Sequence, residues 1–205
     1  IRLGIAYKVV GGVRFYERKE VRDIVAYLRV VANPDDTVSL RRIVNTPKRA
    51  IGDRAQACVA VYSENAGVSF YQALIDAAAG NVPLLNSRAV KQISGFVDLI
   101  EGLRNDFLAV FGESDTPDAD TTTIDAGSEN ADIGELVEAI AHRSGYRDEL
   151  EGSSDPQDGA RLDNVNELIS VAREFSADAA ALDPADRPDP EEGLPEPGSL
   201  AAFLE

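Results

Sequence analysis

Basic side chains gather in one short stretch of this sequence, RRIVNTPKRAIGDRA, which runs from residue 41 to residue 55. The stretch carries five cations, which are Arg41, Arg42, Lys48, Arg49 and Arg54. Pro47 and Gly52 predict a tight turn between two helices. A helix that begins at such a turn presents unpaired backbone N–H groups, and these groups together with nearby cations can bind a phosphate. Because Asp53 is expected to cap its own helix, the amides left for a phosphate would be those of Ala50, Ile51 and Gly52.

The distribution of charge favours a local contact with a polyanion. The formal net charge is -16, but residues 1–60 carry 12 Lys and Arg against 6 Asp and Glu, a net charge of +6. Residues 61–205 carry 8 against 30, a net charge of -22. A basic segment attracts polyanions over short, salt-screened distances, and an acidic remainder repels them elsewhere. The residues alone leave a second interpretation open, in which the stretch is a solvated basic loop that only joins two helices.

Sequence motifs for catalysis are missing. The sequence has no GxxxxGK[ST] motif and no Gly-Lys dipeptide, so we expect no nucleotide bound in the P-loop manner. His142 is the only histidine, which excludes an HExxH zinc site and a histidine-based triad, and we predict that it is an ordinary surface residue. Acidic pairs such as Asp35 with Asp36 lie in turn-like sequence rather than in a pocket. We therefore predict no catalytic residue, no metal site and no cofactor in this segment.

Cys58 is the only cysteine, so the chain has no internal disulfide and fits a reducing compartment. It shares a helical stripe with Ala55 and Tyr62, which favours a buried, inert thiol. An exposed thiol would instead be able to bridge two copies of the chain. A homodimer formed through Cys58 is therefore the alternative to keep in view.

The elements that must hold the basic stretch are helices. The hydrophobic content of 44% is mostly Ala, Val, Leu and Ile, and apolar residues recur at helical spacing, so we predict a mainly α fold. The helix predicted at 87–111 is the longest and should be the central packing element. The basic turn should join the helix predicted at 36–45 to the one predicted at 53–65. The predicted elements are a short strand at 5–10 and helices within 17–33, 36–45, 53–65, 69–79, 87–111, 133–145 and 160–175.

Two segments are predicted to lack regular secondary structure. Residues 112–132 are acidic, Thr-rich and poor in large apolar side chains, which predicts a flexible excursion, and residues 183–198 read as a Pro-rich acidic linker. A helix restarts at 199–205. The start at Ile1 without Met or a leader predicts a piece excised from a longer chain. The longest apolar runs are far shorter than the roughly 20 residues that cross a bilayer, so we expect a soluble protein with no membrane partner.

Residues 7–53, YKVVGGVRFYERKEVRDIVAYLRVVANPDDTVSLRRIVNTPKRAIGD, resemble a segment of UvrD/PcrA-type superfamily 1 DNA helicases. In that family the segment leaves the second RecA-like domain, 2A, and enters its inserted accessory domain, 2B. Weaker similarities follow at 144–151, 161–175 and 198–205. The resemblance implies a 2A fragment at 1–34, a helical 2B domain at 35–182, the linker at 183–198 and the start of the return into 2A at 199–205.

The family motif NxPxRGIG is similar to the sequence at the basic turn. It falls on Asn45, Pro47, Arg49, Ile51 and Gly52, and in the family it contacts the backbone of duplex DNA ahead of the unwinding junction. This sequence departs from the motif at residue 50, where Ala50 replaces the first glycine. If that position needs a positive φ, alanine costs about 1 kcal/mol; if the glycine only lets a phosphate approach, a methyl group is tolerated.

The resemblance also implies a function for the parent protein. It implies an ATP-dependent 3'-5' DNA helicase of DNA repair, cytoplasmic and nucleoid-associated in a bacterium, with ATP and Mg on its motor domains. The implied partners of this segment are duplex DNA at a junction and the other domains of the same helicase. Rotation of 2B about hinges near 33–36 and 183–198 would switch how the duplex is held. The alternative role is a protein-interaction module that controls dimerisation, with Cys58 as the linking residue.

Overall fold

The computed structural model describes residues 12–111, 132–181 and 198–204, and within these ranges it contains helices and turns but no strand. The mainly α prediction is therefore confirmed. The predicted strand at 5–10 lies outside the described residues, as do nearly all of the acidic excursion at 112–132 and of the linker at 183–198.

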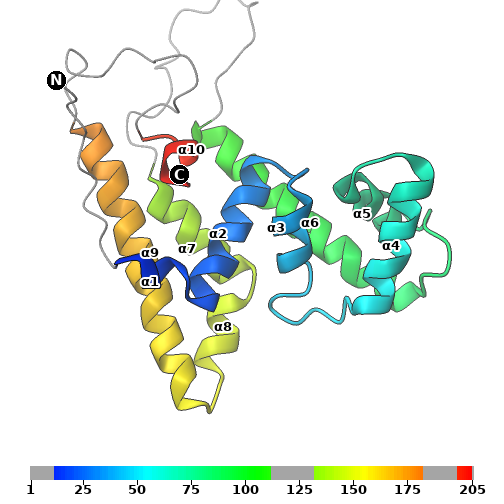
Figure 1. Ribbon diagram of the computed structural model, residues 1–205, viewed down its shortest axis with the longest axis horizontal. Helices are drawn as coiled ribbons and strands as arrows, with labels where there is room; N and C mark the ends of the chain where they lie inside the picture. Colours follow the sequence, from blue (N-terminus) through cyan, green and yellow to red (C-terminus); the bar gives the residue numbers. More distant parts are fainter. Residues whose placement is uncertain (1–11, 112–131, 182–197, 205) are drawn as a thin grey trace, which may run out of the picture.

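Helix α2 (Lys19–Ala32) lies in the middle of the molecule (Figure 1). Val21, Ile24 and Leu28 lie on one apolar stripe of this helix, and all three are fully buried. The helix packs against α3 (Thr37–Ile43), α6 (Ser87–Phe111), α7 (Ile133–Arg143) and α9 (Pro156–Ala180). The buried residues of all these helices form one hydrophobic core.

Helices α4 (Asp53–Ala66) and α5 (Phe70–Ala78) form the second part of the fold. They pack on each other, and α5 packs on α6. Figure 1 shows both at one end of α6, on the side away from α7 and α9. The turn between α3 and α4 therefore runs along the junction of the two parts.

Two short helices were not predicted. Helix α8 (Tyr146–Glu151) begins at once after α7, because Gly145 adopts φ 77 and breaks the helical path. Helix α1 (Gly12–Tyr16) lies between the predicted strand and the first predicted helix. The last described helix is α10 (Leu200–Phe203), and it lies where we expected a helix to restart.

Side chains cap α3 and α5. Asp36 accepts a hydrogen bond from the backbone N–H of Ser39, and Ser69 accepts one from the backbone N–H of Gln72. The prediction for Asp53 is wrong. Gly52, with φ -75 and ψ 174, is the N-cap of α4, and Asp53 is already the first helical residue, so no side chain caps this helix.

None of the described helices is long and apolar enough to span a membrane.

Candidate nucleic-acid interface

The side chain of Asn45 bonds to two backbone groups of the turn at residues 44–52. Its Oδ1 accepts hydrogen bonds from the backbone N–H of Arg49 at 2.9 Å and of Ile51 at 3.2 Å. The prediction that the Ile51 amide is free for a phosphate is therefore wrong, because Asn45 already uses it. The side chain of Ile51 is fully buried, which fixes this part of the turn on the core.

Arg49 directs its guanidinium into the protein rather than to solvent. Nη1 donates to the carbonyl oxygens of Ile43 at 3.1 Å and Pro47 at 3.2 Å. Nη2 donates to the Tyr27 hydroxyl at 2.6 Å and to the Ser144 carbonyl at 2.8 Å. The structure thus gives this side chain an internal role, whereas the sequence suggested a phosphate contact.

Aromatic rings complete the site around Arg49. Its guanidinium carbon lies 5.8 Å from the ring centre of Tyr27 and 5.6 Å from that of Phe96, within the range of a cation–π contact. The Tyr27 hydroxyl donates in turn to the Thr46 carbonyl at 2.6 Å. Burial raises the pKa of Tyr27 to about 12, although the nearby Arg49 charge opposes the shift. The hydroxyl therefore keeps its proton and acts as the donor to Thr46.

Arg42 is also occupied inside the fold. Its Nη2 forms an ion pair with Asp23 Oδ1 at 2.7 Å, and the Asp23 side chain is only 2% exposed. The hydroxyl of Tyr146 donates to the other oxygen of Asp23 at 2.8 Å. Burial is the main cause that raises the pKa of Tyr146, with the Asp23 charge adding to it. The charge of Arg42 is thus balanced by a buried carboxylate, which leaves little of it for a ligand.

The other three cations of the basic stretch are exposed. Lys48 and Arg54 lie in solvent on either side of the turn, and Arg41 is exposed with its guanidinium 4.8 Å from the ring centre of Phe70. The basic stretch therefore divides into two cations used by the fold, Arg42 and Arg49, and three that face outward.

Ala50 and Gly52 form the outer surface of the turn. Ala50 is exposed and adopts φ 59, the left-handed region that an alanine enters at a cost of about 1 kcal/mol. A glycine at this position would adopt the same conformation without that cost. A Cβ built on Gly52 would meet no atom within 4 Å, so the backbone there faces open space.

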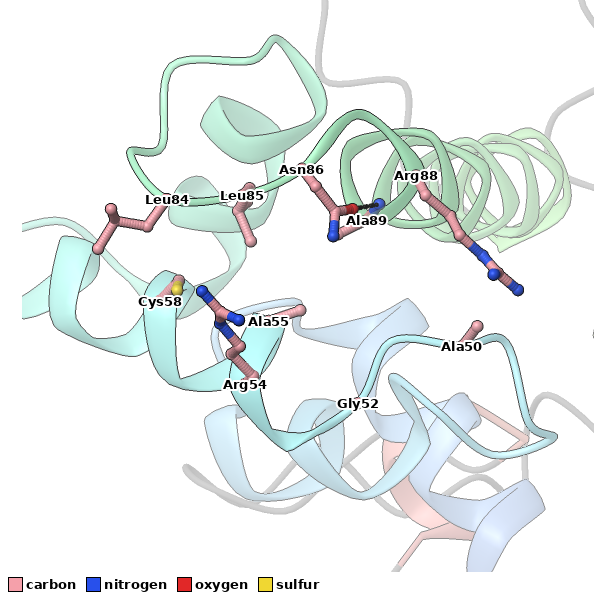
Figure 2. Close-up of a pocket in the computed structure, with 10 residues that line it drawn as sticks. All are labelled: Ala50, Gly52, Arg54, Ala55, Cys58, Leu84, Leu85, Asn86, Arg88 and Ala89. Carbon is pink, nitrogen blue, oxygen red and sulfur yellow. Dashed lines mark hydrogen bonds between the residues drawn. The ribbon is translucent and has the colours of Figure 1, made fainter.

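An open groove of about 470 Å³ separates the start of α4 from the start of α6 (Figure 2). Figure 2 shows Arg54 reaching into the groove and Arg88, from the first turn of α6, on the side where Ala50 lies. The groove is lined by Ala50, Gly52, Arg54, Ala55, Cys58, Leu84, Leu85, Asn86, Arg88 and Ala89. Its polar end combines two helix starts with two exposed arginines, an arrangement that suits an anionic ligand.

Sequence reasoning missed Arg88, although it predicted the start of α6. Asn86 accepts a hydrogen bond from the Ala89 N–H at 2.8 Å and so caps this helix. A cation in the first turn of a helix opposes the helix dipole. A cation in this unfavourable position, two residues after the Asn86 cap, is the signal in the sequence that could have drawn attention to Arg88.

Cys58 lies at the other end of the groove. It is half-buried and packs partly against the core, which lies between the buried thiol that the sequence favoured and the exposed thiol of the alternative. His142 is exposed, as predicted. Among the described residues no group of three or more His, Cys, Asp or Glu side chains could hold a metal ion.

Comparison with known proteins places this helical domain in a family. The chain belongs to the UvrD-like helicase C-terminal domain family, whose model matches residues 1–205. It is 59% identical over 208 residues to ATP-dependent DNA helicase UvrD1 of Mycobacterium tuberculosis, a match that covers 100% of this chain and 24% of that protein. It is 53% identical over 208 residues to the helicase of the same name from Mycobacterium leprae, with the same coverage.

A more distant relative is ATP-dependent DNA helicase PcrA of Bacillus subtilis. It is 34% identical over 177 residues, which cover 85% of this chain and 20% of that protein. The resemblance to UvrD/PcrA-type helicases is therefore confirmed. The chain spans about a quarter of the length of the curated relatives it matches.

Proposed function

We propose that this chain supplies the duplex-contacting and regulatory domain, 2B, of an ATP-dependent 3'-5' DNA helicase of DNA repair. Family membership and the names of the relatives support the helicase assignment. One observation carries the assignment of the DNA contact. Lys48 is exposed on the turn, and the exposed Arg54 and Arg88 line the groove beside it. ATP and Mg would bind to the motor domains of the parent protein.

The chemistry of the turn suits a phosphate backbone better than bases. The backbone at Ala50 and Gly52 is exposed at the start of a 14-residue helix, and Lys48 and Arg54 flank it. Backbone amides and flexible cations contact phosphate oxygens but carry no sequence information. The proposed contact is therefore weak, non-specific and sensitive to salt, as expected for a domain that holds duplex of any sequence.

The proposed domain layout is a 2A fragment at 1–34, 2B at 35–182, a linker at 183–198 and a return at 199–205. The first boundary falls between α2 and α3, which pack on each other and share the Asp23–Arg42 ion pair. A hinge near 33–36 would have to open this contact when 2B rotates, and it would also have to separate α2 from α6, α7 and α9, which share its core. Loss of the pair leaves a buried carboxylate without its cation, so the rotation carries an energetic cost at this end.

The proposed contact is tested by titrating the 205-residue chain with a short DNA duplex and following fluorescence anisotropy at several salt concentrations. The slope of log affinity against log salt should become shallower by about 0.9 for each phosphate that a variant no longer touches. Lys48→Ala with Arg54→Ala should lower both the affinity and the steepness of the slope. Arg22→Ala removes an exposed cation from α2 and serves as the matched control. If the double variant behaves as the control does, the turn is not the contact.

A second candidate function is self-association, because the groove has an apolar end. Cys58 is partly accessible there, and Leu84, which lines the same groove, is 84% exposed. An apolar rim around a thiol would suit a second copy of the chain. Light scattering with and without reductant measures the oligomer directly. Equal mass in both conditions, or an oxidised dimer that persists in Cys58→Ser, would remove this route.

A further inference from the structure

We propose that Tyr27 and Arg49 are positioning residues that latch the turn at 44–52 into the conformation that contacts DNA, without touching DNA themselves. The inference rests on the proposed function, because it explains how the contact surface of that function is kept in shape. It assigns a positioning role to a tyrosine that is fully buried and therefore lies out of reach of any ligand.

The Arg49 side chain joins three parts of the molecule. It bonds to the carbonyl of Ile43 at the end of α3, to that of Pro47 within the turn, and to that of Ser144 between α7 and α8. All four acceptors of its guanidinium are neutral oxygens, one of them the Tyr27 hydroxyl. The planar donor fork of arginine satisfies several such acceptors at fixed angles, which lysine cannot do.

The Tyr27 hydroxyl connects the two sides of Pro47. It accepts from Arg49, two residues after the proline, and donates to the carbonyl of Thr46, directly before it. One hydroxyl group thereby fixes the distance between the entry and the middle of the turn. The Tyr27 ring packs against the Arg49 guanidinium and so limits how far this side chain can enter the fold.

The latch determines which residues face outward. From Lys48 to Gly52 exposure alternates, with Arg49 and Ile51 directed inward and Lys48, Ala50 and Gly52 in solvent. Holding the Arg49 side chain inside leaves its two neighbours, Lys48 and Ala50, in solvent. Release of the latch would let the turn move between conformations, and only a fraction of molecules would then present the DNA-contacting surface.

A latch and a direct contact predict different salt behaviour. If Tyr27 and Arg49 only set the population of the competent turn, the apparent affinity falls by that fraction while the bound state keeps the same phosphate contacts. The salt slope then stays at the wild-type value. Removal of a residue that touches a phosphate makes the slope shallower by about 0.9.

The experiment compares Tyr27→Phe, Arg49→Lys and Arg49→Gln with Lys48→Ala in the duplex titration, and measures amide hydrogen exchange in the free chain. We expect Tyr27→Phe to speed exchange at the N–H groups of Arg49 and Ile51 by roughly fivefold to thirtyfold, because the lost hydroxyl makes two hydrogen bonds. We expect both Arg49 variants to weaken duplex binding with an unchanged salt slope. Tyr62→Phe removes a hydroxyl that bonds to Asp76, outside the turn, and should alter neither property.

Two results would overturn the proposal. One is unchanged exchange at the turn amides of Tyr27→Phe, which would mean that the hydroxyl does not hold the turn. The other is a salt slope that becomes shallower in Arg49→Gln as it does in Lys48→Ala, which would make Arg49 a direct contact. If the wild-type chain does not bind duplex at all, the proposed function fails, and the exchange measurement still decides whether the latch exists.

Discussion

The inner and outer sides of the turn at 44–52 use the same residue types for opposite purposes. On the inner side, Arg42 forms an ion pair with Asp23, and Arg49 donates hydrogen bonds to neutral oxygens of the fold. On the outer side, Lys48 and Arg54 remain in solvent. The comparison teaches that a count of basic residues overstates the charge that a ligand can meet, because a cation with buried partners acts as a structural group.

The largest effect should come from removing Arg49. Arg49→Ala deletes four hydrogen bonds and leaves the Tyr27 hydroxyl and the carbonyl of Ser144 without this donor, so we expect about 2 to 4 kcal/mol lower stability. Lys48→Ala, next to it on the outer side, should change stability by less than about 0.5 kcal/mol. Urea denaturation of both variants measures the contrast. Equal losses of stability would erase the distinction between the two sides.

A smaller effect should follow when the inner acceptor of the turn is removed. Asn45→Ala leaves the N–H groups of Arg49 and Ile51 without their shared partner, and we expect about 1 to 3 kcal/mol lower stability. Asn45→Asp keeps an acceptor oxygen in the same place and is the matched control. Thermal unfolding compares the two. A destabilisation of the same size in both variants would show that the hydrogen bonds of Oδ1 are not what holds the turn.

The sequence predicts the helices better than it predicts the directions of side chains. The stripe of α2 and the bounds of α6 follow from apolar periodicity, because each helix is long enough to repeat its pattern. Helices α1 and α8 have five and six residues, too few to show a period. They are stabilised by tertiary packing instead, with Phe15 and Tyr146 buried in the core.

The location of the candidate site was predictable, but the division of its cations was not. A proline, a glycine and five cations in fifteen residues mark the turn without any structure. Whether a cation faces inward depends on partners that are distant in the sequence. The acceptor at Ser144 is 95 residues from Arg49, and local pattern carries no information about it. The ion pair between Arg42 and Asp23 could not be predicted from the sequence either, since an acidic residue on a helix is usually solvated.

The smallest expected effect has the opposite sign and concerns the outer side. Ala50 adopts φ 59 with its methyl group in solvent, so Ala50→Gly relieves backbone strain, although glycine also gains entropy in the unfolded chain. We expect a net stabilisation of about 0.5 kcal/mol. Ala57→Gly, at an exposed position inside α4, should instead destabilise by about 1 kcal/mol. Chemical denaturation of the pair tests the signs, and a destabilisation in both would mean that the left-handed conformation at residue 50 is not strained. Duplex affinity of Ala50→Gly sharpens the comparison further, because an unchanged value would show that the methyl group does not obstruct the phosphate.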